Sequence, residues 1–465
     1  MTQIKLRNWQ IECAESALAV YERHSHFLCH ATPGAGKTVM VASVAKTLFL
    51  ENKIDFVICF SPSRAVARGV AETFSRVLGR SFNGQMGAAG GSYTYQSMDT
   101  LPDELWRVLD EYRVFVVLDE IHHCSGTNWS DSSIGNSWGR TILERIQGKA
   151  SYTMSLSGTP WRTDNCPIAL SHYRDSDGQI SCDYEYGLRR AISDQTCRAP
   201  QIVLVDNREI SLQSSAFGCR SFASISESLE NKHIKYPDFL FRDEIIDQIL
   251  SEASRRLTNL RRSAPEAGGL VVASSVAHAE QIARRLSMID ETSIIVTYKS
   301  PDAQKTISKF KTSSARWIVS VGMISEGTDI PRLHVCCHLS RIRTELHFRQ
   351  VLGRILRRQE TEMADSNAWL YVLAEPSLTE FARRIEEDLP GERVVSIHSD
   401  SVSTDGQTSK KIELVEGQDL SLPLDPVGRN SVEESIHNEG SSEKNSIDLH
   451  VSNRFWNEIL SLFVT

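Results

Sequence analysis

The sequence predicts an α/β protein made of two tandem parallel-sheet domains, followed by an acidic and flexible C-terminal tail, on three observations. Short and continuously apolar runs, such as residues 114–118, are typical of parallel strands that are buried on both faces. These runs alternate with helical stretches of about 10–15 residues, which is the pattern of βαβ units. The alternation occurs twice, once on each side of a mixed and polar stretch at residues 166–237.

The expected elements follow from this alternation in chain order. A short apolar strand at residues 26–30 leads into a glycine loop and then a helix at residues 38–50, which contains neither Pro nor Gly. The further strands expected in the first half are residues 56–60, 114–118 and 151–156. The strands expected in the second half are residues 269–273, 293–297, 317–321, 335–339 and 369–373, and its helices are residues 276–288 and 303–311.

These elements divide the chain into five expected segments. They are a first domain at residues 1–200, a connector at 201–235, a second domain at 236–398, an acidic low-complexity linker at 399–446 and a terminal amphipathic helix at 447–465. The linker is rich in Ser, Asp, Glu, Asn and Gly, a composition that buries too little apolar surface to fold. The last segment suits a helix that docks on the core or a peptide that binds a partner, because five apolar side chains share one helical face: Phe455, Trp456, Ile459, Leu460 and Phe463.

The net charge of −8 is concentrated in one region, because residues 400–449 carry 11 acidic and 4 basic side chains. The rest of the chain is therefore close to neutral, and local basic clusters there can bind phosphate groups. The second half contains such a cluster of arginines: Arg341, Arg343, Arg349, Arg354, Arg357 and Arg358.

The composition is that of a globular protein of 465 residues, and we expect it to be cytoplasmic and without a membrane partner. No stretch approaches the ~20 apolar residues of a membrane span, and the N-terminus lacks the apolar core of a secretory signal. Ten cysteines occur without a C-x-x-C pair, which favours buried and reduced thiols. The alternative is a zinc site, although short ligand pairs are missing from its candidate ligands Cys166, Cys182, Cys197 and Cys219.

Residues 31–38, of sequence ATPGAGKT, have the pattern of a phosphate-binding loop. Gly34 and Gly36 let backbone N–H groups approach phosphates closely, and the N-terminus of the following helix attracts negative charge. In this pattern Lys37 reaches the β- and γ-phosphates of a nucleotide, and Thr38 is a ligand of Mg²⁺. The strict pattern has Gly at the first position, where this chain has Ala. An ordinary glycine turn is the alternative, which the strand–loop–helix context disfavours.

Asp119 and Glu120 follow directly after an apolar strand, and acidic residues at the carboxyl edge of a buried strand point into the ligand crevice. Asp119 is the candidate Mg²⁺ ligand, through water, and Glu120 is the candidate general base for the attacking water. His122 is expected to link the nucleotide site to the second half. Nearby His123 and Cys124 allow a metal site, although a structural hydrogen bond is the more common role of such a histidine.

The run QVLGRILR at residues 350–357 places two arginines three positions apart. A guanidinium can span the charge that develops on the γ-phosphoryl group, and it reaches the nucleotide only when two halves of a protein close. Gln350, Arg354 and Arg357 are therefore candidate catalytic residues. An amphipathic basic helix on a solvated face is the alternative.

With these motifs, residues 6–389 resemble superfamily 2 helicases and translocases with a DEAH/DExH-type box, and they look closest to the restriction-subunit-like (XPB/RadD-like) branch. The resemblance implies two RecA-like domains that bind ATP and Mg²⁺ between them. It also implies that Gln10 reads the adenine edge and that Gly327 and Asp329 contact the nucleotide. The residues that match the family's Q-x-x-G-R-x-x-R motif are Gln350, Gly353, Arg354 and Arg357.

The same resemblance implies contacts with nucleic acid and a coupling element. The implied contacts with the nucleic-acid backbone are Ser63, Arg64, Thr94, Gln96 and Thr328. The residues implied to couple hydrolysis to movement are His122, Ser157 and Thr159. Three tryptophans can stack on bases, although packing is the favoured role: Trp129, Trp138 and Trp161.

The leading hypothesis is an ATP-dependent helicase or translocase whose partner is nucleic acid, with DNA favoured over RNA by the branch resemblance. The alternative is a nucleic-acid-stimulated ATPase that does not unwind. It would be the motor subunit of a restriction, repair or phage-defence complex and would bind a protein partner through the C-terminal tail. A non-enzymatic scaffold is the third hypothesis, but the intact Lys37, Glu120 and Arg354 count against it.

Overall fold

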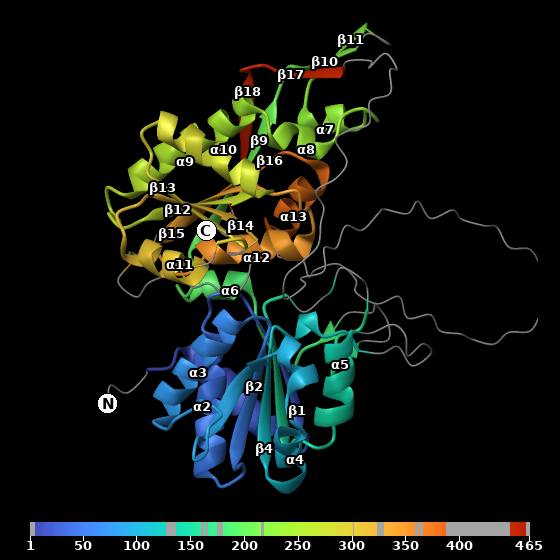
Figure 1. Cartoon of the computed structure of the whole chain (residues 1–465), viewed down its shortest axis with the longest axis vertical. Helices are drawn as coiled ribbons and strands as arrows, with labels where there is room; N and C mark the ends of the chain where they lie inside the picture. Colours follow the sequence, from blue (N-terminus) through green and yellow to red (C-terminus); the bar gives the residue numbers. More distant parts are fainter. Residues whose placement is uncertain are drawn as a thin grey trace, which may run out of the picture.

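The computed structural model of the chain describes residues 5–126, 136–159, 162, 166–173, 180–214, 218–300, 302–322, 330–358, 362, 366–386 and 447–461. Two α/β domains are stacked along the long axis of the molecule, with the N-terminal domain at the bottom of Figure 1. The predicted α/β fold with parallel sheets is confirmed. The linker expected at 399–446 and the motif residues Gly327, Thr328 and Asp329 lie outside the described residues.

The first domain contains a six-stranded parallel sheet with the strand order β3-β2-β4-β5-β1-β8. Its elements are α1 (Asn8–Val20), β1 (His26–Ala31), α2 (Lys37–Leu50), β2 (Phe56–Ser61), α3 (Arg64–Leu78), β3 (Gly90–Thr94), η1 (Tyr95–Thr100), α4 (Asp103–Glu111), β4 (Val114–Asp119), η2 (Ile121–His123), α5 (Ser137–Thr141), η3 (Ile142–Ile146), β5 (Tyr152–Ser157), β6 (His172–Tyr173), β7 (Ile180–Ser181), β8 (Tyr184–Tyr186) and α6 (Leu188–Ser193).

Apolar side chains cover both faces of this sheet, and strand β4 is buried at every position. Met40 of α2 and Phe74 of α3 belong to the hydrophobic cluster on one face, whereas Trp106 of α4 and Ile142 belong to the cluster on the other. Figure 1 shows α2 and α3 on one side of the sheet and α4 and α5 on the other. Because the strands are parallel, the loops that follow β1, β4 and β5 meet at one edge of the sheet.

The second domain contains a seven-stranded sheet with the order β13-β14-β12-β15-β16-β9-β18, in which only β18 is antiparallel to its neighbour. A smaller antiparallel sheet has the order β11-β10-β17. The elements are β9 (Ala199–Asn207), β10 (Ile210–Ser214), β11 (Gly218–Phe222), α7 (Ile225–Leu229), α8 (Tyr236–Leu240), α9 (Asp243–Leu260), β12 (Gly268–Ala273), α10 (Val276–Met288), β13 (Ser293–Thr297), α11 (Ala303–Thr312), β14 (Trp317–Val321), β15 (Leu333–Leu339), α12 (Glu345–Ile355), β16 (Asn367–Leu373), α13 (Pro376–Glu386), β17 (Ile447–Val451) and β18 (Phe455–Ser461).

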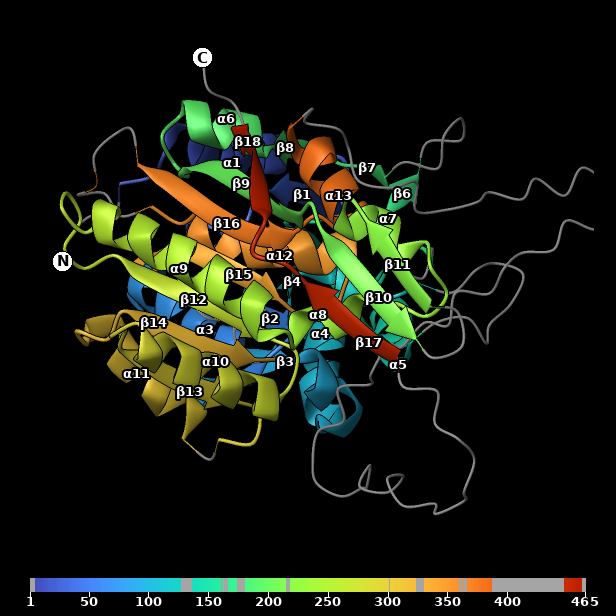
Figure 2. The same cartoon turned by 90° about the horizontal axis from the view of Figure 1, so that it is seen from above.

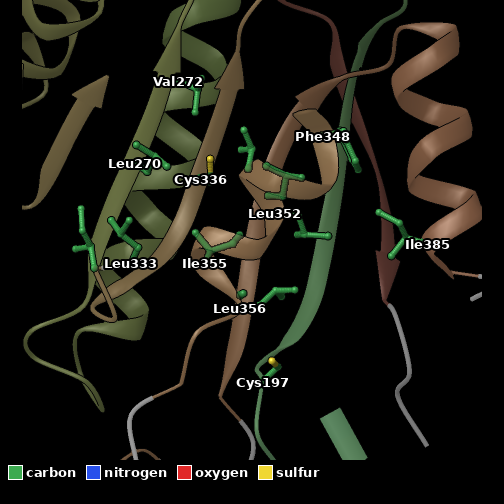
Figure 3. Close-up of a cluster of buried hydrophobic side chains, with 14 of the residues drawn as sticks. Cys197, Leu270, Val272, Leu333, Cys336, Phe348, Leu352, Ile355, Leu356 and Ile385 are labelled. Atoms are coloured by element: carbon green, nitrogen blue, oxygen red, sulfur yellow. The ribbon is translucent and has the colours of Figure 1, made fainter. Parts of the chain in front are cut away.

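Helix α12 carries the arginine motif, and its apolar face fixes it on the second sheet. Thr344 caps the N-terminus by accepting the His347 N–H. Figure 3 shows Leu352 and Ile355 pointing into an apolar cluster with side chains from β12 and β15. The cluster also contains Cys197, which lies just before β9. The end of α12 is therefore held where the chain passes from the first domain to the second.

The terminal helix expected at residues 447–465 is wrong, because this segment contains strands β17 and β18. They pair antiparallel with β10 and β9, and Figure 2 shows each beside its partner. The i, i+4 spacing of the apolar residues fits a helix. However, the edge of β9 offers a row of backbone partners, and the aromatic and β-branched side chains of the segment also suit a strand.

The prediction of a connector at residues 201–235 is wrong for its first residues. They belong to β9, which pairs in parallel with β16 inside the second sheet. This pairing favours a domain boundary before Ala199. The strands and helices expected elsewhere are confirmed, with ends that differ by at most two residues. These elements are the ones that position the loops at the domain junction.

Candidate active site

The loop between β1 and α2 turns through two glycines with positive φ, Gly34 at 85° and Gly36 at 98°. Gly36 is the N-cap of α2, and Lys37 begins the helix. The Lys37 ammonium donates to the carbonyl oxygen of Ala31 at 3.0 Å, so the side chain folds back over the loop. Left-handed glycines and the N–H groups of a helix N-terminus together make a backbone cradle for an anion.

Arg7 and Gln10 brace this loop from the N-terminal helix α1. The Arg7 guanidinium donates to the carbonyl oxygen of Ala35 at 2.9 Å, and the Gln10 side-chain amide donates to that of Gly36 at 2.9 Å. The amide oxygen of Gln10 also accepts the Arg7 N–H at 2.8 Å. Gln10, which was expected to read the adenine edge, thus contacts the backbone of the loop, and its contact with a base stays a prediction.

Asp119 ends strand β4 and is only 9% exposed. Burial raises the pKa of its carboxyl group to about 7, Glu120 adds to the rise, and Lys37 opposes it. Because a buried carboxylate is costly to ionise without a cation, this residue is suited to hold one. Thr38, in the first turn of α2, offers a hydroxyl oxygen. Hydroxyl and carboxylate oxygens are hard ligands, so the donor set fits Mg²⁺.

Glu120 lies between the loop lysine and the loop that follows β5. Its Oε1 is 3.4 Å from Lys37 Nζ, and its Oε2 accepts the Gly158 N–H at 3.2 Å. Its φ of 52° is in the left-handed region, which a residue with a side chain rarely adopts. Such strain costs ~1–3 kcal/mol and persists only where the surrounding contacts enforce it. The carboxylate is thus held opposite Lys37 by both backbone and side-chain contacts.

The three expected coupling residues lie together beside Glu120. His122 is buried, and its Nδ1 is 3.0 Å from Ser157 Oγ and 3.5 Å from Glu120 Oε2. Ser157 Oγ accepts the Thr159 N–H at 3.0 Å. A shift of the loop after β5 therefore reaches the Glu120 carboxylate through two routes, the Gly158 N–H and the His122 ring.

The end of α12 lies against the phosphate-binding loop across the domain junction. A side chain at Gly353 would place its Cβ 2.6 Å from Pro33 Cβ, and one at Gly34 would place its Cβ 2.9 Å from Arg357 Cγ. The second arginine of the motif is therefore in contact range of the loop. The other two candidate catalytic residues of the motif lie within the same helix: Gln350 and Arg354.

Arg198, which no sequence motif indicated, connects this junction to the second sheet. Its side chain is fully buried and pairs with Glu362. It also donates to three backbone carbonyl groups, those of Pro331, Leu333 and Ile355, at distances of 2.6 to 2.8 Å. Burial lowers the pKa of Arg198, and Glu362 opposes this effect. The residue ties the end of α12 to the start of β15, a contact that only the fold reveals.

The candidate nucleic-acid residues of the first domain lie at or just after the carboxyl ends of β2 and β3. Ser63 caps α3, and the Gln96 side-chain amide donates to the carbonyl oxygen of Pro62 at 3.1 Å. Between α3 and β3 runs a groove of about 370 Å³. It brings the candidates Arg64 and Thr94 together with residues that the sequence analysis missed, including Arg68, Asn83 and Tyr93.

Other sequence hypotheses find less support at this site. Among the described residues, no group of three or more His, Cys, Asp or Glu side chains could hold a metal ion. Trp138 stacks on Tyr95 with ring centroids 6.0 Å apart, which is a packing role, and Trp129 and Trp161 lie outside the described residues. No described helix is both long and apolar enough to cross a lipid bilayer.

Comparison with known proteins adds a family match in the first domain. Residues 3–162 match the family model described as "Type III restriction enzyme, res subunit". Rv2917 of Mycobacterium tuberculosis is 30% identical over 403 residues, and ML1624 of Mycobacterium leprae is 30% identical over 397 residues. Each alignment covers 82% of this chain, which spans 63% of the length of the first relative and 64% of the second.

Solved structures share the two-domain fold. A Vibrio vulnificus fragment, assigned as the HsdR subunit of a type I restriction enzyme, has a TM-score of 0.55 and 16% identity, over 83% of this chain and 67% of its own. The DNA-bound Type ISP restriction-modification enzyme LlaBIII has a TM-score of 0.50 and 14% identity, over 80% of this chain and 28% of that enzyme. Saccharomyces cerevisiae Dbp5, bound to RNA and ADP BeF3, has a TM-score of 0.50 and 14% identity, over 81% of this chain and 86% of Dbp5. At these identities the likeness shows the fold, a pair of RecA-like domains.

Proposed function

We propose that this chain, a superfamily 2 helicase of the restriction-subunit-like kind, is an ATP-dependent motor that moves along nucleic acid. The observation that carries the proposal is the contact between Gly353 and Pro33. It brings the arginine motif of the second domain to the phosphate-binding loop of the first. A site that is completed only by domain contact can convert nucleotide binding into domain movement.

In this proposal each candidate residue of the first domain has one task. Lys37 neutralises charge on the β- and γ-phosphates of ATP. Gln10 reads the adenine edge, as the family resemblance implies. Thr38 and Asp119 hold Mg²⁺, which supplies charge neutralisation at the phosphate oxygens when bound. Glu120 orients the attacking water and accepts its proton.

The second domain supplies the complementary charge. Arg354 and Arg357 bind the negative charge that spreads over the transferred phosphoryl group, and Gln350 lies one turn before Arg354 in α12. When the γ-phosphate leaves, the charge that holds the arginines leaves with it, and the domains can separate. The Glu120–His122–Ser157 contacts transmit this change to the loop after β5.

We assign the track to single-stranded nucleic acid, with DNA favoured over RNA. Ser63, Arg64, Thr94 and Gln96 are the proposed contacts of the first domain, and Thr328, between the proposed nucleotide contacts Gly327 and Asp329, is the proposed contact of the second. Most of these contacts would go to phosphates, so we expect little sequence specificity. The groove between α3 and β3 supports this assignment because it gathers arginine and polar side chains.

The test is steady-state ATPase activity of the purified chain, alone and with single-stranded DNA, duplex DNA or RNA of matched length. We expect strong stimulation by single-stranded DNA. A turnover rate that is equally high without any polymer would contradict the motor assignment, and stronger stimulation by RNA would overturn the choice of DNA.

The second candidate is a motor subunit that translocates without unwinding, in a restriction, repair or phage-defence complex. The family description of the first domain names a subunit, which favours this candidate. A strand-displacement assay separates the two candidates. Stimulated ATPase activity with no displaced strand favours the motor subunit, whereas displacement at a matching ATP concentration favours the helicase.

A further inference from the structure

The loop between β15 and α12 exposes three consecutive residues, Arg341, Ile342 and Arg343. Ile342 is 51% exposed, which is unusual for a large apolar side chain in this chain. The loop has a defined shape: Ser340 Oγ accepts the Ile342 N–H at 3.1 Å, and Thr344 caps the following helix. An exposed apolar tip between two cations is therefore presented on a hydrogen-bonded turn.

Aromatic rings hold both guanidinium groups in place. Arg341 lies over the ring of Phe241 at 5.2 Å from its centroid, and Arg343 lies over the ring of Tyr236 at 5.3 Å. Tyr236 is buried, so its ring is a fixed support. Such cation–π contacts favour the observed positions of the two side chains and lower the entropy that the arginine loses when it binds a ligand.

The two arginines differ in how much of their charge is already balanced. Arg343 donates to the buried carboxylate of Glu375 at 2.7 Å. No ion pair of Arg341 is found among the residues that the structure describes. Within the described part of the chain, the Arg341 guanidinium is thus a positioned cation without a carboxylate partner. Other arginines of the same sequence cluster are engaged, since Arg349 pairs with Glu345.

The position of this loop in the sheet indicates its ligand. It follows the carboxyl end of β15, and ligands of open α/β sheets bind outside the carboxyl ends of the strands. Tyr298, 63% exposed, and Lys299 stand at the carboxyl end of β13, three strands away in the sheet order, a separation of ~14 Å. Exposed rings and apolar tips beside cations fit single-stranded nucleic acid, whose bases and phosphates alternate.

We propose that Arg341 and Ile342 form a binding site for one strand of nucleic acid on the second domain. The guanidinium binds a phosphate, and the isoleucine side chain packs against the adjoining base. This inference rests on the proposed function, because it assumes a nucleic-acid track. It adds to that track a contact that lies outside the motifs, in the loop between β15 and α12.

The experiment measures binding of the full chain to fluorescent oligo-thymidylate and oligo-uridylate across a salt series. Arg341→Gln should weaken binding by about 3- to 10-fold and reduce the slope of log K against log salt by ~0.7, the value for one phosphate contact on a single strand. Ile342→Ser should weaken binding with an unchanged slope, because it removes only packing against a base. Arg284→Gln, an exposed arginine on α10, is the control and should match the unaltered chain.

Phe241→Leu tests the bracing, because it keeps the charge of Arg341 but removes its support. It should weaken binding less than Arg341→Gln does, and thermal unfolding checks that the variant folds.

The inference is overturned if Arg341→Gln binds like Arg284→Gln with the same salt slope, the result expected if an acidic protein segment occupies the loop instead. If the unaltered chain binds neither oligonucleotide and neither stimulates its ATPase, the proposed function fails as well. If Arg341→Gln loses affinity equally for both oligonucleotides, the arginine recognises the phosphates that they share. If it loses affinity for only one of them, that kind of strand is identified as the track.

Discussion

Gly353 of α12 lies directly against Pro33 of the phosphate-binding loop, where a Cβ at position 353 would come within 2.6 Å of the proline Cβ. Packed Cβ atoms do not approach this closely, so the two domains can meet in this way only if position 353 is glycine. The proposed catalytic arginine Arg354 is the next residue of the helix, and its reach to the nucleotide depends on this contact.

Gly353→Ala is therefore expected to lower the nucleic-acid-stimulated ATPase rate by ~10- to 100-fold, because even a 1 Å displacement of a catalytic group can have this effect. The clash lies at the junction, so the thermal midpoint should change little. Gly69→Ala is the matched control, since Gly69 is also helical and its added Cβ would have no neighbour within 4 Å. Equal ATPase rates in the two variants would show that the domain contact is not needed for turnover.

Glu120→Gln should reduce ATPase activity at least ~100-fold while the protein still binds ATP, because the amide keeps the shape of the side chain but cannot take a proton. Lys37→Ala should lose both activity and nucleotide affinity, since the ammonium faces the expected phosphates. Fluorescent-nucleotide titration beside the ATPase assay separates the two effects. A near-normal rate in either variant contradicts the assigned roles.

The fold was largely predictable because its central strands are short apolar runs. Strand β14 matches the expected bounds and is buried at every position, since a strand buried on both faces leaves a continuous hydrophobic signal. Strand β18 was missed because its state depends on β9, more than two hundred residues away in sequence. Local spacing cannot reveal such a partner, and here it favoured a helix.

The candidate site was predictable only where one short motif contains all its parts. The loop around Lys37 and the acidic pair at Asp119 each follow a strand that is recognisable in the sequence as an apolar run. Arg198 was not predictable, because its partners come from the ends of β15 and α12 and from Glu362, and they meet only in the folded chain. The family resemblance that the motifs indicated is confirmed by the res-subunit match of residues 3–162.

Arg198→Met tests the buried junction. Removing one partner of a buried ion pair leaves Glu362 without its main cation, and such changes cost ~3–5 kcal/mol. Urea denaturation should show this loss, with Arg262→Gln, an exposed arginine after α9, as the control. A double variant with Glu362→Gln should recover part of the stability. A loss below ~1 kcal/mol in the single variant would mean that the buried pair contributes little.

The C-terminal strands are expected to stabilise the second domain. Leu460 is 7% exposed whereas its neighbour Ile459 is 50% exposed. Leu460→Ala should therefore cost ~2–3 kcal/mol, and Ile459→Ala distinctly less. Deleting residues 447–465 should lower the thermal midpoint and promote self-association, because the edge of β9 becomes unpaired. A deletion variant as stable and monomeric as the full chain would show that β17 and β18 contribute nothing to the sheet.

Burial is the chief cause that raises the pKa of Asp119 to about 7. The ordinary pKa of an aspartate is ~3.9, so the folded state binds this proton more tightly than the unfolded state does. Stability contributed in this way is present at low pH and is lost as pH rises from ~4 to ~7. Asp119→Asn removes the ionisation, so without Mg²⁺ its thermal midpoint should exceed that of the unaltered chain above pH 7, and the difference should shrink toward pH ~4. Glu15→Gln, an exposed site on α1, controls for the loss of one negative charge. With Mg²⁺ and a non-hydrolysable ATP analogue added, the unaltered chain should have the higher thermal midpoint, because only the carboxylate can hold the cation. A difference that stays constant across this pH range would show that Asp119 ionises in the fold without cost, and the argument that it needs a cation partner would fail.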